Sequence, residues 1–207
     1  RLKNGEFINL DDENIKDLDL LFNDLNLQYK DIEDGQVEID KYHSLYLENF
    51  MSQSSLQFNR DQHFQNLISH IEEKNHEDIQ VPEHYKNILR DYQVQGFQWL
   101  KTMSDYGFGG ILADDMGLGK TIQVISFILK QKETGALKQP ALVVCPTTLL
   151  GNWVKEIKHF APAIKTSVYH GIERQLDTKA DVIITTYAIL RIDIEQIKKQ
   201  KWSMMII

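Results

Sequence analysis

Short apolar segments alternate with amphipathic helical patterns through the second half of the chain, and this alternation limits the folds open to it. Ala141–Cys145 is entirely apolar with two valines at its centre, as is typical of a strand buried on both faces. Helical apolar spacing occupies residues 122–129 before it and 149–160 after it. This order predicts an α/β fold, a parallel sheet flanked by helices. The other segments expected as strands are residues 110–113, 166–169, 182–185 and 204–207.

Residues 1–80 follow a different pattern and are predicted to form a separate module ahead of a domain at 81–207. A polar stretch at residues 74–88, containing Val81-Pro82, is typical of a linker. Residues 5–10 alternate like a short strand, and residues 11–13 are suited to start a helix. We therefore expect a small α+β or mostly helical module. Its core is expected to come from two helical stripes, Leu18, Leu21, Phe22 and Leu25, then Phe64, Leu67, Ile68 and Ile71.

Composition excludes several classes of protein. No apolar run approaches the roughly 20 residues that span a bilayer, so no membrane partner is expected. One cysteine fits a reducing compartment, and we expect the cytoplasm. The net charge of −7 argues against a freestanding nucleic-acid binder, although the acidic excess lies in the first part of the chain. Because the chain begins with Arg1 and ends within an apolar run, we expect it to be part of a longer protein.

The strongest chemical signal is the loop at residues 113–121, between an expected strand and an expected helix. Glycines at 117 and 119 let the backbone curl, so that its amides and the helix N-terminus face an anion. Lys120 can reach the outer phosphates of a nucleotide, and the Thr121 hydroxyl can ligate Mg²⁺. The eight-residue pattern usually begins with glycine, and Asp114 stands there instead; the alternative is a glycine-rich turn with a solvated lysine. The residues expected to bind nucleotide are Asp115, Met116, Gly117, Leu118, Gly119, Lys120 and Thr121, with Lys120 and Thr121 also catalytic.

Residues 89–100 and 114–121 together closely resemble the SWI/SNF family of helicase superfamily two. In that family a Leu-Arg-x-Tyr-Gln segment precedes the phosphate loop and its glutamine recognises adenine, which implies ATP as the cofactor and adds Arg90 and Gln93 to the nucleotide site. The amide of Gln93 offers the donor and acceptor that adenine needs. The alternative is a polar residue on an amphipathic helix. Residues 1–25 more loosely resemble the helicase-associated region of bacterial members.

Two further segments resemble family motifs that face the DNA backbone. Residues 143–150, followed by Asn152, resemble the second helicase motif, in which a proline and hydroxyl residues lie at a strand end; Thr147 or Thr148 could equally cap a helix. Residues 183–187 resemble the next DNA motif. Residues 169–171 with Arg174 resemble another family segment; the alternative, a turn with a solvated arginine, is favoured there. The expected nucleic-acid contacts are Pro146, Thr147, Thr148, Asn152, Thr185, Thr186 and Tyr187.

The resemblance implies a motor with two RecA-like lobes and ATP with Mg²⁺ in the cleft between them. Such motors step along double-stranded DNA and remodel protein–DNA complexes, and a DNA-bound protein such as RNA polymerase is a candidate partner, at the nucleoid in a bacterium. Residues 202–207 resemble the strand that leads to the family's Asp-Glu box, so we expect an incomplete first lobe without that box or the second lobe. This chain alone is expected to bind ATP weakly and not to turn it over.

Two alternatives remain open at this point. The first is an RNA helicase lobe of the same superfamily, although the loop and the Leu-Arg-x-Tyr-Gln segment favour DNA translocases. The second is a regulatory or interaction module at residues 1–80, with the nucleotide site acting as a switch. The acidity of that module could let it compete with DNA for the motor surface.

Overall fold

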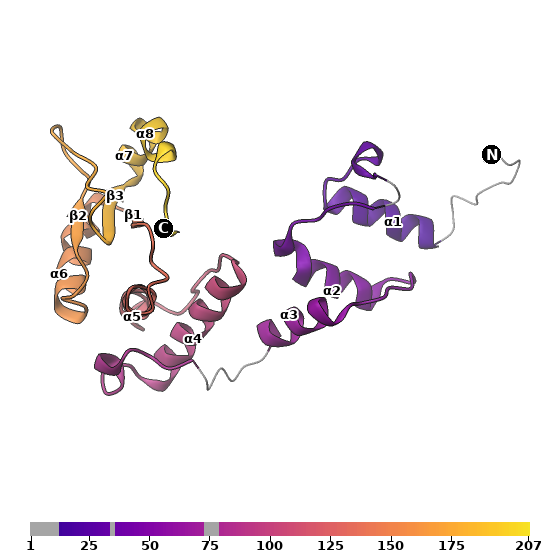
Figure 1. The fold of residues 1–207 in the computed structure, drawn as a ribbon, viewed down its shortest axis with the longest axis horizontal. Helices are drawn as coiled ribbons and strands as arrows, with labels where there is room; N and C mark the ends of the chain where they lie inside the picture. The colour runs from indigo at the N-terminus through magenta and orange to yellow at the C-terminus, as the bar shows by residue number, and fades with distance from the viewer. Residues whose placement is uncertain (1–12, 34–35, 73–78) are drawn as a thin grey trace, which may run out of the picture. The chain divides into compact units, whose positions relative to one another are not determined.

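The computed structural model describes residues 13–33, 36–72 and 79–207. Contacts divide the chain into two compact units, residues 1–74 with 106–108 and residues 75–105 with 109–207 (Figure 1). The strand expected at residues 5–10 lies outside the described residues. In the described part of the chain, no helix is both long enough and apolar enough to cross a bilayer.

The first unit is mostly helical in its described residues, which is one of the two forms predicted for it. Its described elements are α1 (Glu13–Asp24), η1 (Tyr29–Asp31), η2 (Lys41–His43), α2 (Ser44–Gln53) and α3 (Gln62–Glu72), with one isolated antiparallel bridge between Glu33 and Gln36. Leu25, Phe50 and Ile68 are buried. Leu18, expected in the core, is instead 44% exposed, and α1 buries none of its own residues. A small unit buries a small share of its surface, and of this predicted stripe only Leu25, directly after α1, is buried.

The second unit is built on a parallel sheet, which confirms the predicted α/β class. Its four strands lie in the order β2-β3-β1-β4: β1 (Ala141–Cys145), β2 (Thr166–Val168), β3 (Val182–Thr186) and β4 (Met204–Ile206). All three strand pairings are parallel, and β1 pairs with β3 from Ala141↔Val182 to Cys145↔Thr186. The helical elements are η3 (Glu83–Tyr85), α4 (Asp91–Tyr106), α5 (Lys120–Glu133), η4 (Thr147–Leu149), α6 (Leu150–Phe160), α7 (Tyr187–Ile192) and α8 (Ile194–Lys199).

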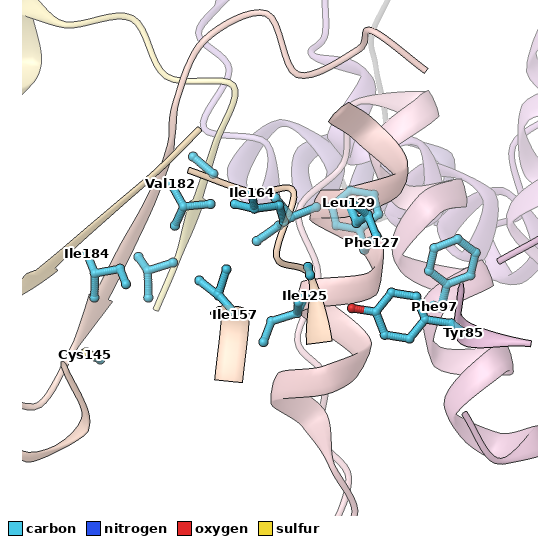
Figure 2. Packing of buried hydrophobic residues seen from close by; sticks show 14 of the residues in the cluster. Tyr85, Phe97, Ile125, Phe127, Leu129, Cys145, Ile157, Ile164, Val182 and Ile184 are labelled. Atoms are coloured by element: carbon cyan, nitrogen blue, oxygen red, sulfur yellow. The ribbon is translucent and has the colours of Figure 1, made fainter. Parts of the chain in front are cut away.

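Each face of the sheet has its own apolar core, because successive strand residues point to opposite faces. Figure 2 shows the first core, in which Cys145, Val182 and Ile184 of the strands gather with residues of α5 and α6 such as Ile125 and Ile157. The second core joins the other strand residues to α7 and α8: Leu142, Val144, Tyr169, Ala180, Ile183, Ile189 and Ile197. A fully buried isoleucine contributes roughly 1.5–3 kcal/mol, so these two layers hold the sheet together.

The strand predicted at residues 110–113 does not form. Ile111 is 87% exposed, and the segment joins none of the four described strands. A strand needs a neighbour for its hydrogen bonds, which an apolar pattern alone cannot supply. Instead the segment approaches α4 closely, since a Cβ added at Gly110 would lie 2.3 Å from the ring of Trp99.

Candidate nucleotide-binding site

The last turn of α5 is anchored beside the amino edge of the sheet. Lys132, in the last turn of α5, donates to Asp181 Oδ2 at 2.5 Å and to the Ala163 carbonyl at 2.6 Å. Asp181 directly precedes β3, so the end of α5 is fixed at the amino edge. The 14 residues of α5 extend about 20 Å, so the loop before Lys120 lies about that far from this anchor.

The loop before α5 is a tight turn, not an extended segment. Gly117 and Gly119 have φ values of +85° and +78°, the left-handed region that favours glycine. Gly119 is the N-cap of α5, so the helix begins at Lys120 with its first amides unpaired within the helix. A Cβ added at Gly117 would meet nothing within 4 Å, which leaves open space beside the loop. Unpaired amides and the helix dipole suit this position to an anion.

The side chain of Lys120 lies folded against the loop. Its Nζ donates to the carbonyls of Asp114 at 2.7 Å and Asp115 at 3.0 Å. The alternative of a solvated lysine is therefore wrong. An ammonium has three donors, so one remains for a further acceptor, and charged phosphate oxygens bind it more strongly than neutral carbonyls.

Gln93 of α4 braces the other end of this loop. Its Nε2 donates to the Leu118 carbonyl at 2.9 Å, and its Oε1 accepts the backbone N–H of Arg90 at 3.0 Å. The Tyr92 hydroxyl donates to the same Leu118 carbonyl at 3.2 Å. Gln93 is buried, and a Cβ at Gly119 would lie 2.5 Å from its Nε2. The adenine contact of Gln93 stays a prediction, whereas its bracing of the loop is a role that the sequence did not indicate.

The remaining nucleotide candidates surround the loop at its surface. Arg90 is exposed at the start of α4, and Thr121 is half-buried in the first turn of α5. The exposed loop positions are Asp115, Met116, Gly117 and Leu118. An open groove of about 490 Å³ lies beside them, lined by Tyr92, Gln95, Gly96, Trp99 and residues 111–114.

Exposed residues, most of them polar, follow β1 and β3 at the carboxyl edge of the sheet. Pro146, Thr147, Thr148 and Asn152 are exposed, and Tyr187 is 49% exposed. The pairing of Cys145 with Thr186 brings the two strand ends side by side. The N-cap positions of η4 and α6 are Pro146 and Leu149, and neither helix has a side-chain cap bond. The helix-cap alternative for Thr147 and Thr148 is therefore wrong.

Two of the predicted DNA contacts are instead structural. Thr185 is 0% exposed and its hydroxyl donates to the Tyr169 carbonyl at 2.8 Å. Thr186 is buried and caps α7 by accepting the Ile189 N–H at 3.3 Å. Both belong to β3, an inner strand covered on both faces, so their hydroxyls cannot reach a ligand at the surface. For these residues the prediction is wrong.

Arg174 is not the solvated residue that was favoured from the sequence. Its Nε and second guanidinium nitrogen donate to the two carboxylate oxygens of Asp193 at 2.5 Å and 2.9 Å, and Nη1 donates to the Gly171 carbonyl. The Tyr169 hydroxyl donates to Asp193 at 2.8 Å. These hydrogen bonds, that from Arg174 first, lower the pKa of Asp193, while burial and then Asp193 raise the pKa of Tyr169. The network ties the 170–179 loop to the α7–α8 junction.

Comparison with known families assigns both parts of the chain. Residues 92–207 match the SNF2-related domain, and residues 1–82 match the bacterial SNF2 helicase associated domain. The Bacillus subtilis protein YwqA, whose name describes an ATP-dependent helicase/translocase, is 40% identical over 59% of this chain and 15% of its own length. The chromatin-remodeling ATPase INO80 of Arabidopsis thaliana is 36% identical over 62% of this chain and 10% of its own.

A solved structure agrees with the fold. The SWI2/SNF2 ATPase core of Sulfolobus solfataricus in complex with double-stranded DNA superposes with a TM-score of 0.56 and 41% sequence identity, over 61% of this chain and 27% of that one. The present chain thus spans a small part of the length of the relatives that it matches. The resemblance of the sequence motifs is confirmed, and the chain belongs to the SNF2-related family.

Proposed function

We propose that this chain provides the ATP-binding half-site of a motor that moves along double-stranded DNA and remodels protein–DNA complexes. The observation that carries the proposal is Lys120, which stands at the N-terminus of α5 and binds a carbonyl of a loop with two glycines in the left-handed region. The relatives support it, since YwqA is named a helicase/translocase and the archaeal core was solved on duplex DNA. Residues 1–80 are the helicase-associated module of this motor, and residues 81–207 belong to its first RecA-like lobe.

The residues of the loop fit ATP with Mg²⁺. Lys120 already binds two oxygen acceptors, and phosphate oxygens offer it stronger ones. The open space beside Gly117 gives a phosphate access to the loop amides. Thr121 follows the lysine and would supply its hydroxyl to Mg²⁺, which neutralises charge on the phosphates when bound. Arg90 and Gln93 would approach the base, with Gln93 keeping one N–H and one lone pair for it.

The duplex would contact the carboxyl edge of the sheet. Small hydroxyls and an amide there are typical donors to DNA phosphates, which fix a protein on the duplex without reading its sequence. The residues assigned to this contact are Pro146, Thr147, Thr148, Asn152 and Tyr187. Because β1 and β3 are neighbours, the contacts from both strands share one surface. The loop at residues 113–121 belongs to the same unit as this surface, so ATP binding and DNA binding can influence each other.

ATPase measurements on the full-length protein test this proposal. Lys120→Ala should lower DNA-stimulated ATP hydrolysis at least about 100-fold, because removal of one preorganised electrostatic group costs this much in other enzymes. Lys130→Ala, on the same helix but away from the loop, is the matched control and should retain activity. Full activity in Lys120→Ala would overturn the nucleotide site. Stimulation by RNA but not by duplex DNA would replace the DNA motor with the RNA helicase alternative.

A further inference from the structure

Gln123 of α5 has a buried side-chain amide of which only the nitrogen is hydrogen-bonded within the described residues. Its side chain is 0% exposed, and its Nε2 donates to Asp114 Oδ2 at 2.9 Å. Its Oε1 accepts no hydrogen bond from any residue in the described ranges. A buried acceptor left unpaired costs roughly 1–3 kcal/mol, so an apolar side chain in this place would stabilise the fold more. Stability alone therefore does not account for an amide at this position.

Gly96 of α4 provides the space for this amide. A Cβ at that position would lie 1.8 Å from Gln123 Oε1 and 3.0 Å from its Cδ. Glycine inside a helix costs about 1 kcal/mol relative to alanine. Two unfavourable features, a mid-helix glycine and an unpaired carbonyl, thus belong to one arrangement. What the arrangement achieves is the bond from Gln123 to Asp114.

Asp114 links Gln123 to Lys120 through two hydrogen bonds. Its carboxylate accepts from Gln123, and its backbone carbonyl accepts from Lys120 Nζ at 2.7 Å. Asp114 also occupies the position where the eight-residue loop pattern usually has glycine. This departure from the pattern makes the contact possible, because a glycine has no side chain to accept the hydrogen bond from Gln123.

We propose that Gln123 is a positioning residue of the nucleotide site. Through Asp114 it fixes the first part of the loop, and so sets the place from which Lys120 reaches the phosphates. This inference rests on the proposed function of the loop. The positioning acts before phosphate contact and touches no reacting atom, so its loss should weaken nucleotide binding more than it slows hydrolysis at saturating ATP.

Gln123→Leu in the full-length protein separates positioning from stability. Leucine keeps the packing and removes the unpaired carbonyl, so the midpoint of urea unfolding should stay the same or rise. The KM for ATP should nevertheless rise about 5- to 30-fold, which corresponds to the loss of one or two hydrogen bonds. Gln131→Leu is the matched control: Gln131 is also buried on α5 with an unpaired Oε1, but its Nε2 donates to Ser104 and not to the loop. Its KM should be that of the wild type.

The outcomes distinguish this inference from the function on which it rests. If Lys120→Ala abolishes hydrolysis while Gln123→Leu binds ATP like the wild type, Gln123 does not position the loop and only the inference fails. If Lys120→Ala itself has no effect, the nucleotide site fails and the inference with it. Equal rises in KM for Gln123→Leu and Gln131→Leu would show a general effect of altering α5, and would also overturn the positioning role.

Discussion

Gly119→Ala should destabilise the second unit well beyond the strain of its backbone. An alanine at φ +78° costs roughly 1–2 kcal/mol. Its Cβ would also lie 2.5 Å from Gln93 Nε2 and 3.2 Å from Ile122 Cγ2. Gln93 must then move, which breaks its bonds to Leu118 and Arg90 at about 1 kcal/mol each. The expected loss of unfolding free energy is about 3–4 kcal/mol, from which the lower entropy of the unfolded chain takes up to about 1 kcal/mol.

Two other glycines provide matched controls, since they share the backbone strain but not the contact. Gly117 has φ +85°, Gly135 has φ +72°, and a Cβ at either would meet nothing within 4 Å. Alanine at these positions should lower the free energy of unfolding by about 1–2 kcal/mol through backbone strain. The lower entropy of the unfolded chain offsets up to about 1 kcal/mol of this loss. Gly117 lies in the loop at residues 113–121, whereas Gly135 follows the far end of α5.

Urea unfolding followed by tryptophan fluorescence is the suitable assay. All three tryptophans, at positions 99, 153 and 202, belong to the second unit, so the signal reports this unit alone. Gly119→Ala in a Gln93→Ala background should cost little more than the backbone strain, because the clashing amide is gone and only the 3.2 Å contact with Ile122 Cγ2 remains. Equal losses for Gly119→Ala and Gly117→Ala would refute the packing of Gln93 against the loop.

Three further predictions follow from the described contacts. Hydrogen bonds from Arg174 and then Tyr169 lower the pKa of Asp193, so the ionised Asp193 should stabilise the second unit above its ordinary pKa near 3.9. This contribution is lost as the pH falls through the lower pKa of the folded state. Asp193→Asn should therefore destabilise the unit at pH 7 and flatten the pH dependence of its stability, as measured by acid titrations followed by fluorescence. Burial raises the pKa of the Cys145 thiol, and an aromatic disulfide reagent at pH 8 should modify it at least tenfold more slowly in the native protein than in urea. The 207-residue chain by itself should release no phosphate from ATP above background, with or without duplex DNA, and a clear DNA-stimulated rate would contradict the expectation of an incomplete site.

The inner strands and their helices could be predicted because their patterns are local. Ala141–Cys145 is buried along its whole length, and its apolar run shows this directly. The apolar residues of α5 and α6 repeat every three to four positions, so the sequence predicts where each helix begins and ends to within a few residues. Residues 110–113 carry an equally apolar pattern, but a strand depends on a partner, and partners are not encoded locally.

The candidate site was predicted unevenly for the same reason. Glycines, a lysine and a helix start are neighbours in sequence, so the loop could be identified from residues 113–121 alone. The brace from Gln93 spans 25 positions to Leu118, and no spacing in the sequence indicates it. Hydroxyl residues at the end of β3 matched a surface motif, yet burial of an inner strand turns Thr185 and Thr186 inward. Whether a polar side chain faces a ligand or the core depends on tertiary packing.

The loop is held at both ends by buried amides and left open between them. Gln123 holds Asp114 at its start, from α5, and Gln93 holds Leu118 near its end, from α4. Between these points Met116 is 96% exposed and Gly117 has open space around it. Rigid ends place the lysine and the first amides of α5 before any ligand arrives, which lowers the ordering cost of binding. The middle of the loop is not held and can still adjust to phosphates. The two glutamines would therefore suit the loop to an anion even though Asp114 replaces the usual first glycine of the pattern.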